Sequence, residues 1–184
     1  MEDIILKQKA FFDAGNTWDT RSRRAMLQIL SNTVKEVCGE GDVFQALDAQ
    51  VQDIRKHLYK WTGTGRISML LSLFAKPAKG GPVPHGTVLV DGGAAQDAGA
   101  ILAPLVSALA AGNTAVILLS DSPVGELVRK VVDETFTEDF VATAPAASDQ
   151  PSDDFDFIYT CGSALPCRGY EGFLTFSKSI TDNA

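Results

Sequence analysis

Residues 87–119 read TVLVDGGAAQDAGAILAPLVSALAAGNTAVILL, and their pattern decides the fold. Thr87–Val90 is rich in β-branched residues and ends at an Asp-Gly-Gly turn, which predicts a short strand. Asp97 is suited to cap a following helix, and Gly112 is suited to end it. Ala115–Leu119 is wholly apolar, as expected for a strand covered on both faces. The stretch is therefore a strand–helix–strand unit.

The same alternation continues towards the C-terminus. Ser122-Pro123 is typical of a helix start, and the helix expected over residues 124–136 is followed by strand candidates at Phe140–Thr143 and Phe155–Thr160. Strands that alternate with helices predict a parallel sheet with right-handed crossovers. We therefore predict an α/β fold, in which N-terminal helices precede a partial Rossmann-like, mainly parallel three-layer sheet domain.

The N-terminal third of the chain predicts two longer helices. The first begins at Asp19 or Thr20, ends at Gly39, and is expected to bury one face that comprises Met26, Ile29, Leu30, Thr33 and Val37. The second opens at Gly41-Asp42 and carries an amphipathic seam of Phe44, Leu47, Val51, Ile54, Leu58 and Trp61. The seam is too short for a stable coiled coil with a partner, so we expect it to pack within the chain.

The chain is expected to form a single domain over residues 1–184. Its parts are a helical region (1–76), a linker rich in Pro and Gly (77–86), and half of a doubly wound unit with a divergent tail (87–184). The apolar run over residues 66–76 fits a short helix or a strand equally well. The tail, from residue 164 on, has enough apolar residues to cover a face of the sheet.

Composition limits the classes of partner. The 184 residues are 45% hydrophobic, which supports a real core, and the net charge of −7 disfavours nucleic acid and anionic membranes as partners. The apolar windows are too short to span a bilayer, and the N-terminus has no pattern of a secretory signal. The three cysteines show no disulfide framework, which favours a reducing, cytoplasmic setting.

Polar residues follow each predicted strand, at the edge where open α/β sheets bind ligands. The candidate catalytic residues are Asp91, Gln96 and Asp97, because a partly buried carboxylate can act as a general acid or base. The candidate substrate-binding residues are Ser120, Asp121, Cys161 and Ser163. The structural alternatives are a helix cap for Asp97 and a turn for Asp91.

Other conspicuous side chains are assigned structural roles. The arginines at the start of the first long helix are expected at the surface: Arg21, Arg23 and Arg24. The two tryptophans, Trp18 and Trp61, are expected in the core or in an interface. His57 and His85 are isolated and the cysteines are scattered, so we predict no metal site. The glycines after the first strand lack the spacing of a dinucleotide fingerprint.

Three stretches resemble the N-terminal, cofactor-binding part of aldehyde dehydrogenases, with the long-chain or class 3 branch nearest. They are FFDAGNTWDTRSRRAMLQIL (11–30), LDAQVQDIRKHLYKW (47–61) and above all APLVSALAAGNTAVILLSDSP (103–123). FDFIYTCGS (155–163) is similar to the family's strand that ends in Thr-Gly-Ser. The resemblance covers about residues 8–163, and its most specific block is Ala-Ala-Gly-Asn at 110–113.

The departures from the family pattern concern its functional residues. Ala95 stands where the family has the Asn of its oxyanion hole. Residues 118–121, Leu-Leu-Ser-Asp, replace a turn whose Lys and Glu hold the adenosine ribose. The family's second glycine, which faces the pyrophosphate, has its nearest counterpart in Gly169, two residues late. The family's catalytic domain and oligomerisation hairpin are not matched, and Cys161 and Cys167 align with the cofactor turn rather than with the nucleophile.

The resemblance therefore implies a truncated, degenerate aldehyde dehydrogenase that binds no cofactor. We expect cofactor-independent chemistry, such as cyclisation, isomerisation or dehydration, on a small, largely apolar substrate in a biosynthetic pathway. The alternative is a non-catalytic interaction or scaffold protein that works as a homodimer or with a partner enzyme. A third possibility is a fragment that retains some affinity for nucleotides.

Overall fold

The computed structural model describes residues 1–61, 84–146 and 154–161. The predicted apolar run at 66–76, most of the predicted linker, Ser163, Gly169 and the tail lie outside these residues, as does the side chain of Trp61. The elements in chain order are α1 (Glu2–Asp13), α2 (Thr20–Cys38), α3 (Asp42–Trp61), β1 (Thr87–Asp91), α5 (Ala98–Ala111), β2 (Thr114–Leu119), α6 (Pro123–Thr135), β3 (Val141–Pro145) and β4 (Phe157–Thr160).

The four described strands form one parallel sheet in the order β3-β2-β1-β4. Val88 of β1 lies beside Ala115 of β2, and Leu89 lies beside Ile158 of β4. The chain moves outward from β1 through β2 to β3 and then returns to the other side of β1. The order of the strands therefore reverses between β1 and β4, which is the topological switch point of a doubly wound sheet. The predicted α/β, Rossmann-like class is confirmed.

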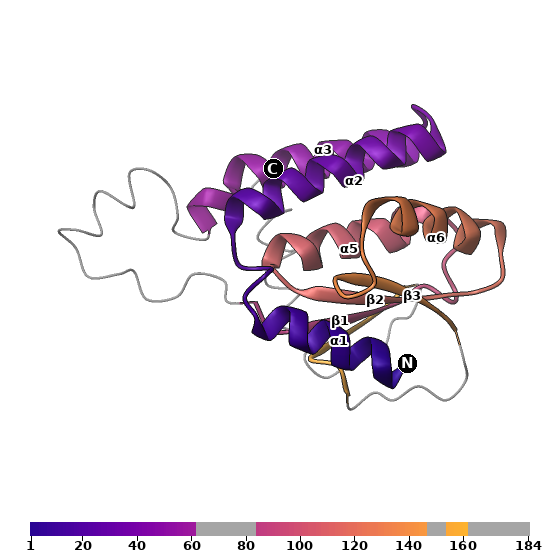
Figure 1. Ribbon diagram of the computed structural model, residues 1–184. Helices are drawn as coiled ribbons and strands as arrows, with labels where there is room; N and C mark the ends of the chain where they lie inside the picture. The colour runs from indigo at the N-terminus through magenta and orange to yellow at the C-terminus, as the bar shows by residue number, and fades with distance from the viewer. Residues whose placement is uncertain (62–83, 147–153, 162–184) are drawn as a thin grey trace.

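Helices cover both faces of the sheet (Figure 1). α5 and α6 pack on one face, α2 and α3 form an outer layer on these two helices, and α1 lies on the opposite face. The main core lies between α5, α6 and the sheet, and includes Val88, Ile117 and Leu105. A smaller cluster on the opposite face joins Leu89, Val116 and Leu118 to Ile4 of α1. No helix of the described ranges is both long and apolar enough to cross a membrane.

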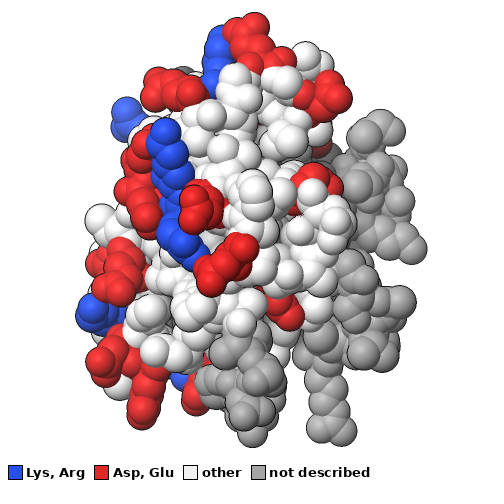
Figure 2. Space-filling view, turned by 90° about the vertical axis from the view of Figure 1, so that its right-hand side faces the viewer, with Lys and Arg blue, Asp and Glu red and all other residues white. Residues whose placement is uncertain are grey.

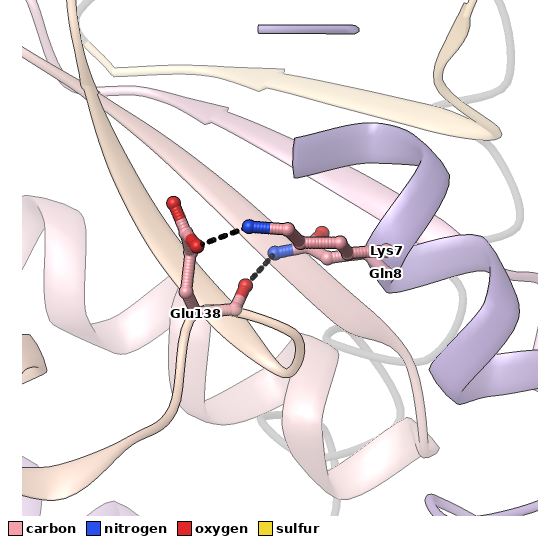
Figure 3. Close-up of polar contacts among 3 residues, drawn as sticks. All are labelled: Lys7, Gln8 and Glu138. Atoms are coloured by element: carbon pink, nitrogen blue, oxygen red, sulfur yellow. Dashed lines mark hydrogen bonds and ion pairs between the residues drawn. The ribbon is translucent and has the colours of Figure 1, made fainter. Parts of the chain in front are cut away.

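α1 is fixed to the sheet by a polar contact that the sequence pattern did not indicate. Gln8 is fully buried, and its amide Nε2 donates to the carbonyl oxygen of Ala115 at 2.8 Å and to that of Glu138 at 3.4 Å. Lys7 Nζ lies 2.8 Å from the Glu138 carboxylate (Figure 3). These contacts join α1 to the start of β2 and to the segment between α6 and β3.

α3 confirms its predicted seam, whereas α2 corrects its predicted face. Leu47, Val51, Ile54 and Leu58 are buried along α3. On α2, Asp19 caps the helix as predicted, and Leu30 and Thr33 of the predicted face are buried. Ile29 of that face is 52% exposed, however, and Leu27 and Val34, which were not predicted, are buried. The predicted and observed faces of α2 share Leu30 and Thr33, and packing against α5 and α6 determines which face is buried.

Arg23 is the main correction in this region, because it is buried and not at the surface. It is 7% exposed, and its guanidinium donates to three carbonyl oxygens: Thr17 at 2.6 Å, Trp18 at 2.9 Å and Ala110 at 3.3 Å. Burial lowers the pKa of Arg23 from its ordinary value. Of the two positions expected for Trp18, the core is wrong, because the side chain is 60% exposed, and an interface stays a prediction. The carbonyl oxygen of Trp18 accepts a hydrogen bond from Arg23.

Candidate functional site

The carboxyl ends of β1 and β4 meet at the switch point and bring Asp91 and Cys161 together. The backbone N–H of Cys161 donates to the carbonyl oxygen of Asp91 at 2.8 Å. Cys161 is 2% exposed, and its Sγ lies 3.2 Å from the carbonyl oxygen of Ala100 in the first turn of α5. Cys161 therefore fills the space between the end of β4 and the start of α5.

The three candidate catalytic residues take different positions at this edge. Asp91 Oδ1 accepts from the N–H of Gly93 at 3.1 Å, so Asp91 shapes the turn after β1. Asp97 is the N-cap of α5 and accepts from the N–H of Ala100 at 2.9 Å. Gln96 is exposed and donates only locally, to the carbonyl oxygen of Ala94 at 3.3 Å. The structure therefore shows both predicted structural roles, the turn at Asp91 and the helix cap at Asp97. Of the three residues, only Asp91 accepts a backbone hydrogen bond from the residue that follows β4, Cys161.

The next strand end contributes Ser120 and Asp121. Ser120 is half-buried, and its hydroxyl lies 3.1 Å from that of Ser122, which caps α6 by accepting from the N–H of Gly125 at 3.1 Å. Asp121 is exposed. The N–H of Gly92 donates to the carbonyl oxygen of Leu118 at 2.9 Å, which ties the turn after β1 to the end of β2. The two predicted substrate-binding residues therefore lie at the adjoining strand end.

The charged side chains that act on the Cys161 thiol at the switch point are acidic, Asp91 and Asp97. The carboxyl ends of the strands point towards the right of Figure 1, the side that faces the viewer in Figure 2. On the left half of that view basic side chains gather beside acidic ones, whereas the visible charged side chains of the right half are acidic (Figure 2). Burial, and then the nearby carboxylates of Asp91 and Asp97, raise the pKa of the Cys161 thiol to about 11.

The raised pKa predicts a loss of stability in alkali. In the unfolded chain the thiol would ionise near its ordinary pKa of 9.0, whereas in the folded protein it stays protonated until about 11. The contribution of the protonated thiol to the free energy of unfolding is therefore complete below pH 9. The free energy of unfolding should fall by about 2 kcal/mol between pH 9 and 11. Urea unfolding at pH 8 and at pH 10.5 measures this fall for the parent and for Cys161→Ser.

The serine variant lacks the thiol, so it should lose less stability than the parent over this interval. Cys38, whose pKa is also raised by burial, titrates in both proteins and cancels from the comparison. Equal losses in the two proteins would show that Cys161 does not carry the effect.

Among the described residues, the edge has few of the groups that a dinucleotide or a metal needs. Dinucleotide-binding sheets place a pyrophosphate at a helix N-terminus, and the Asp97 carboxylate occupies the N-terminus of α5. The turn that the family resemblance assigns to the pyrophosphate, at residues 162–169, lies outside the described residues. Ala95 and Leu118 offer no side-chain donor to a cofactor. Within residues 1–61, 84–146 and 154–161, no three His, Cys, Asp or Glu side chains are placed to hold a metal ion.

The Ala-Ala-Gly-Asn block at residues 110–113 lies at the opposite, amino edge of the sheet. Gly112 has φ +90°, and a Cβ there would lie 2.7 Å from Cζ of Arg23. Asn113 Oδ1 accepts from the N–H groups of His85 at 2.7 Å and Gly86 at 3.2 Å, just before β1. The block thus joins α5, α2 and β1, and its position is structural.

Sequence reasoning missed the roles of Arg23, Asn113 and Asp156. The Asp156 carboxylate accepts from the N–H of Thr87 at 2.8 Å, which holds the segment before β4 against the start of β1. This capping contact explains why β4 starts at Phe157 and not at the predicted Phe155. No periodic pattern marks such residues, because each of them has at least one partner far away in the sequence: Ala110 for Arg23, His85 and Gly86 for Asn113, and Thr87 for Asp156.

The fold and this edge define a Rossmann-like α/β protein, and comparisons with known proteins narrow the class further. The chain is 28% identical to 4,4'-diaponeurosporen-aldehyde dehydrogenase of Staphylococcus aureus (strain NCTC 8325 / PS 47) over 188 aligned residues, 89% of this chain. It is 30% identical to 4,4'-diapolycopene-4,4'-dial dehydrogenase of Cytobacillus firmus over 62% of this chain. It spans only 40% and 26% of the lengths of these relatives. No family model matches the chain.

A solved structure of Staphylococcus aureus AldH in a substrate-bound state is similar in fold. The TM-score is 0.57 at 23% identity, over 85% of this chain and 39% of that one. The chain is therefore aldehyde dehydrogenase-like: its homologues are aldehyde dehydrogenases, and the match covers their N-terminal part. The resemblance inferred from the sequence is confirmed.

Proposed function

We propose that this aldehyde dehydrogenase-like chain performs no NAD-dependent oxidation and instead catalyses a cofactor-independent proton transfer at the carboxyl edge of its sheet. The reaction class is cyclisation, isomerisation or dehydration of a small, largely apolar molecule. The observation that carries the proposal is the position of Asp91, a half-buried carboxylate beside the buried thiol of Cys161 at the switch point. Both cysteines of the described segments are free, in keeping with a reducing cytoplasm.

Asp91 is better placed for proton transfer than Asp97. The Asp97 carboxylate is exposed and caps α5, whereas Asp91 is half-buried and uses one oxygen in the turn after β1. Its other oxygen has no hydrogen-bond donor among the described residues. A carboxylate with one fixed oxygen and one open oxygen can orient itself and still exchange a proton with a substrate. Because its thiol is protonated at neutral pH, Cys161 would line the site as an uncharged side chain and would not act as a nucleophile.

The substrate class follows from the relatives and from the charge of the edge. Both relatives are named for an aldehyde or a dialdehyde, so a small molecule with a carbonyl group is the first class to examine. The carboxylates of Asp91 and Asp97 near the switch point disfavour phosphate-bearing ligands. An uncharged carbonyl compound avoids this repulsion, and general acid or base catalysis at the neighbouring carbon needs only one carboxylate.

A second candidate is a non-catalytic interaction protein, either a homodimer or the partner of another enzyme. It is favoured by large apolar side chains that stand exposed on the surface, Leu6 and Trp18 at 60% each. Tryptophan is a frequent anchor of protein interfaces, and here its backbone is fixed by Arg23. The two candidates differ in what they require of Asp91.

The substitution Asp91→Asn distinguishes the proposed enzyme from the interaction protein. In the native host, Asp91→Asn should reduce formation of the product at least about a hundredfold, because general acid–base catalysis contributes roughly that much or more. Metabolite profiles of cells that carry the parent, Asp91→Asn or no gene measure the effect. Asp133→Asn, an exposed change on α6, serves as the matched control and should behave as the parent. A folded Asp91→Asn protein that restores the full profile would remove Asp91 from the chemistry and favour the interaction protein.

A further inference from the structure

α5 carries a buried proline, Pro104, in its interior. A proline has no N–H group, so it cannot donate to the carbonyl oxygen four residues earlier in the helix, which belongs to Ala100. The proline ring also crowds that oxygen and turns it away from the helix axis. The carbonyl group of Ala100 therefore lacks the N–H donor that a regular helix would supply.

Cys161 supplies a donor to this carbonyl group. Its Sγ lies 3.2 Å from the Ala100 oxygen, although the two residues are 61 positions apart in the chain. The backbone N–H of Cys161 donates to the carbonyl oxygen of Asp91 at 2.8 Å, so hydrogen bonds hold Cys161 both to the end of β1 and to α5. Because Cys161 is only 2% exposed, its thiol is directed to the helix and not to solvent.

The proline strengthens this contact. An S–H group is a weak donor, and in a regular helix each interior carbonyl oxygen already accepts a backbone N–H. A thiol that shares its acceptor with such an N–H forms a weaker hydrogen bond than one that has the acceptor to itself. Pro104 and Cys161 thus compensate each other: the proline leaves an acceptor open in α5, and the thiol that follows β4 occupies it.

The state of this thiol affects the chemistry proposed for Asp91. A thiolate adds to a carbonyl carbon, so that sulfur forms a bond to the carbon and the carbonyl oxygen takes up a proton. We propose that Pro104 is a positioning residue, which leaves the Ala100 carbonyl oxygen free to hold the Cys161 thiol protonated and turned towards α5. A carbonyl substrate beside Asp91 then meets no thiolate. This consequence rests on the proposed function, whereas the hydrogen bond can be tested without it.

Infrared spectroscopy of the S–H stretching band tests the proposal, because the position of this band reports how strongly a thiol is hydrogen-bonded. In the full chain with Cys38→Ser and Cys167→Ser, Cys161 is the one remaining cysteine, and this protein serves as the parent. Pro104→Ala restores an N–H group that donates to the Ala100 oxygen and competes with the thiol. The band should therefore move to higher wavenumber in Pro104→Ala than in the parent.

The matched control is Pro123→Ala at the start of α6, where a proline withholds no helical hydrogen bond. Its S–H band should stay where it is in the parent. Circular dichroism checks that each variant is folded. Pro104→Val, which also restores the N–H group and is close to proline in size, keeps the test decisive if Pro104→Ala does not fold.

A double-mutant cycle gives an independent measurement of the same contact. Cys161→Ala should lower the urea midpoint more in the parent than in Pro104→Ala, because only the parent then leaves the Ala100 carbonyl group without a donor. An unshifted band in both Pro104 variants, or equal effects of Cys161→Ala in the two backgrounds, would overturn the proposal. Neither measurement involves catalysis, so failure of the Asp91→Asn test would refute the proposed chemistry and leave both expected results unchanged.

Discussion

Replacing Arg23 by alanine should lower the free energy of unfolding by about 3–4 kcal/mol. The substitution removes the donor of three carbonyl groups, those of Thr17, Trp18 and Ala110, and leaves a cavity against Gly112. It also removes a positive charge from the C-terminal end of α5, where the helix dipole favours one. Urea unfolding followed by circular dichroism measures the loss.

Two further variants separate the hydrogen bonds of Arg23 from its charge. Arg23→Lys keeps the charge, but a single ammonium cannot reach all three carbonyl groups, so its loss should lie between those of the parent and of Arg23→Ala. Arg21→Ala changes an exposed arginine of the same helix and should shift stability by no more than about 0.5 kcal/mol. Equal effects of Arg23→Ala and Arg21→Ala would refute the structural role given to Arg23.

Gly125→Ala should destabilise the protein by about 2 kcal/mol or more, although helix propensity alone predicts the opposite sign. Within α6, an alanine is favoured over glycine by about 1 kcal/mol. A Cβ at Gly125, however, would lie 2.2 Å from the backbone oxygen of Ser120, so the turn between β2 and α6 would have to move. Thermal or urea unfolding gives the sign directly.

The control for this substitution is Gly41→Ala, where an added Cβ meets no atom within 4 Å. Its stability should stay within about 0.5 kcal/mol of the parent. A stabilised Gly125→Ala variant would mean that the turn holding Ser120 and Asp121 is not as close to α6 as described.

The sheet could be predicted from the sequence because its signals are local. Each strand is a short apolar run bounded by turn residues, and each crossover helix begins at a side-chain cap, Asp97 for α5 and Ser122 for α6. The seam of α3 is equally local, since one face carries nearly all of its large apolar residues. The buried face of α2 was not predictable in this way. Leu27 and Ile29 are comparable in hydrophobicity, and the long-range contacts of Arg23 favour the face of Leu27.

The candidate site was predictable in position but not in its contacts. Parallel strands bring their carboxyl ends to one edge, so Asp91 and Cys161 had to lie near each other once β1 and β4 were adjacent. Burial of the thiol against Ala100 depends on how α5 packs, which the sequence pattern does not specify. The catalytic role of Asp91 stays a prediction.

The amino edge of the sheet contains the block that most specifically resembles the aldehyde dehydrogenase family. The most specific block of the resemblance, residues 110–113, holds α5, α2 and β1 together through Gly112 and Asn113. These contacts preserve the scaffold and lie away from the edge at which a dinucleotide would bind. A chain can therefore keep this block while the described part of its carboxyl edge carries carboxylates and a buried thiol.

Titration of the full chain with NAD and NADP, in the presence and absence of an aldehyde, tests this account most directly. We expect no saturable binding of either dinucleotide up to millimolar concentration and no aldehyde-dependent reduction of either. Micromolar affinity for one of them, together with its reduction by an aldehyde, would contradict the account, since the edge bearing Asp91 and Asp97 would then still serve a dehydrogenase.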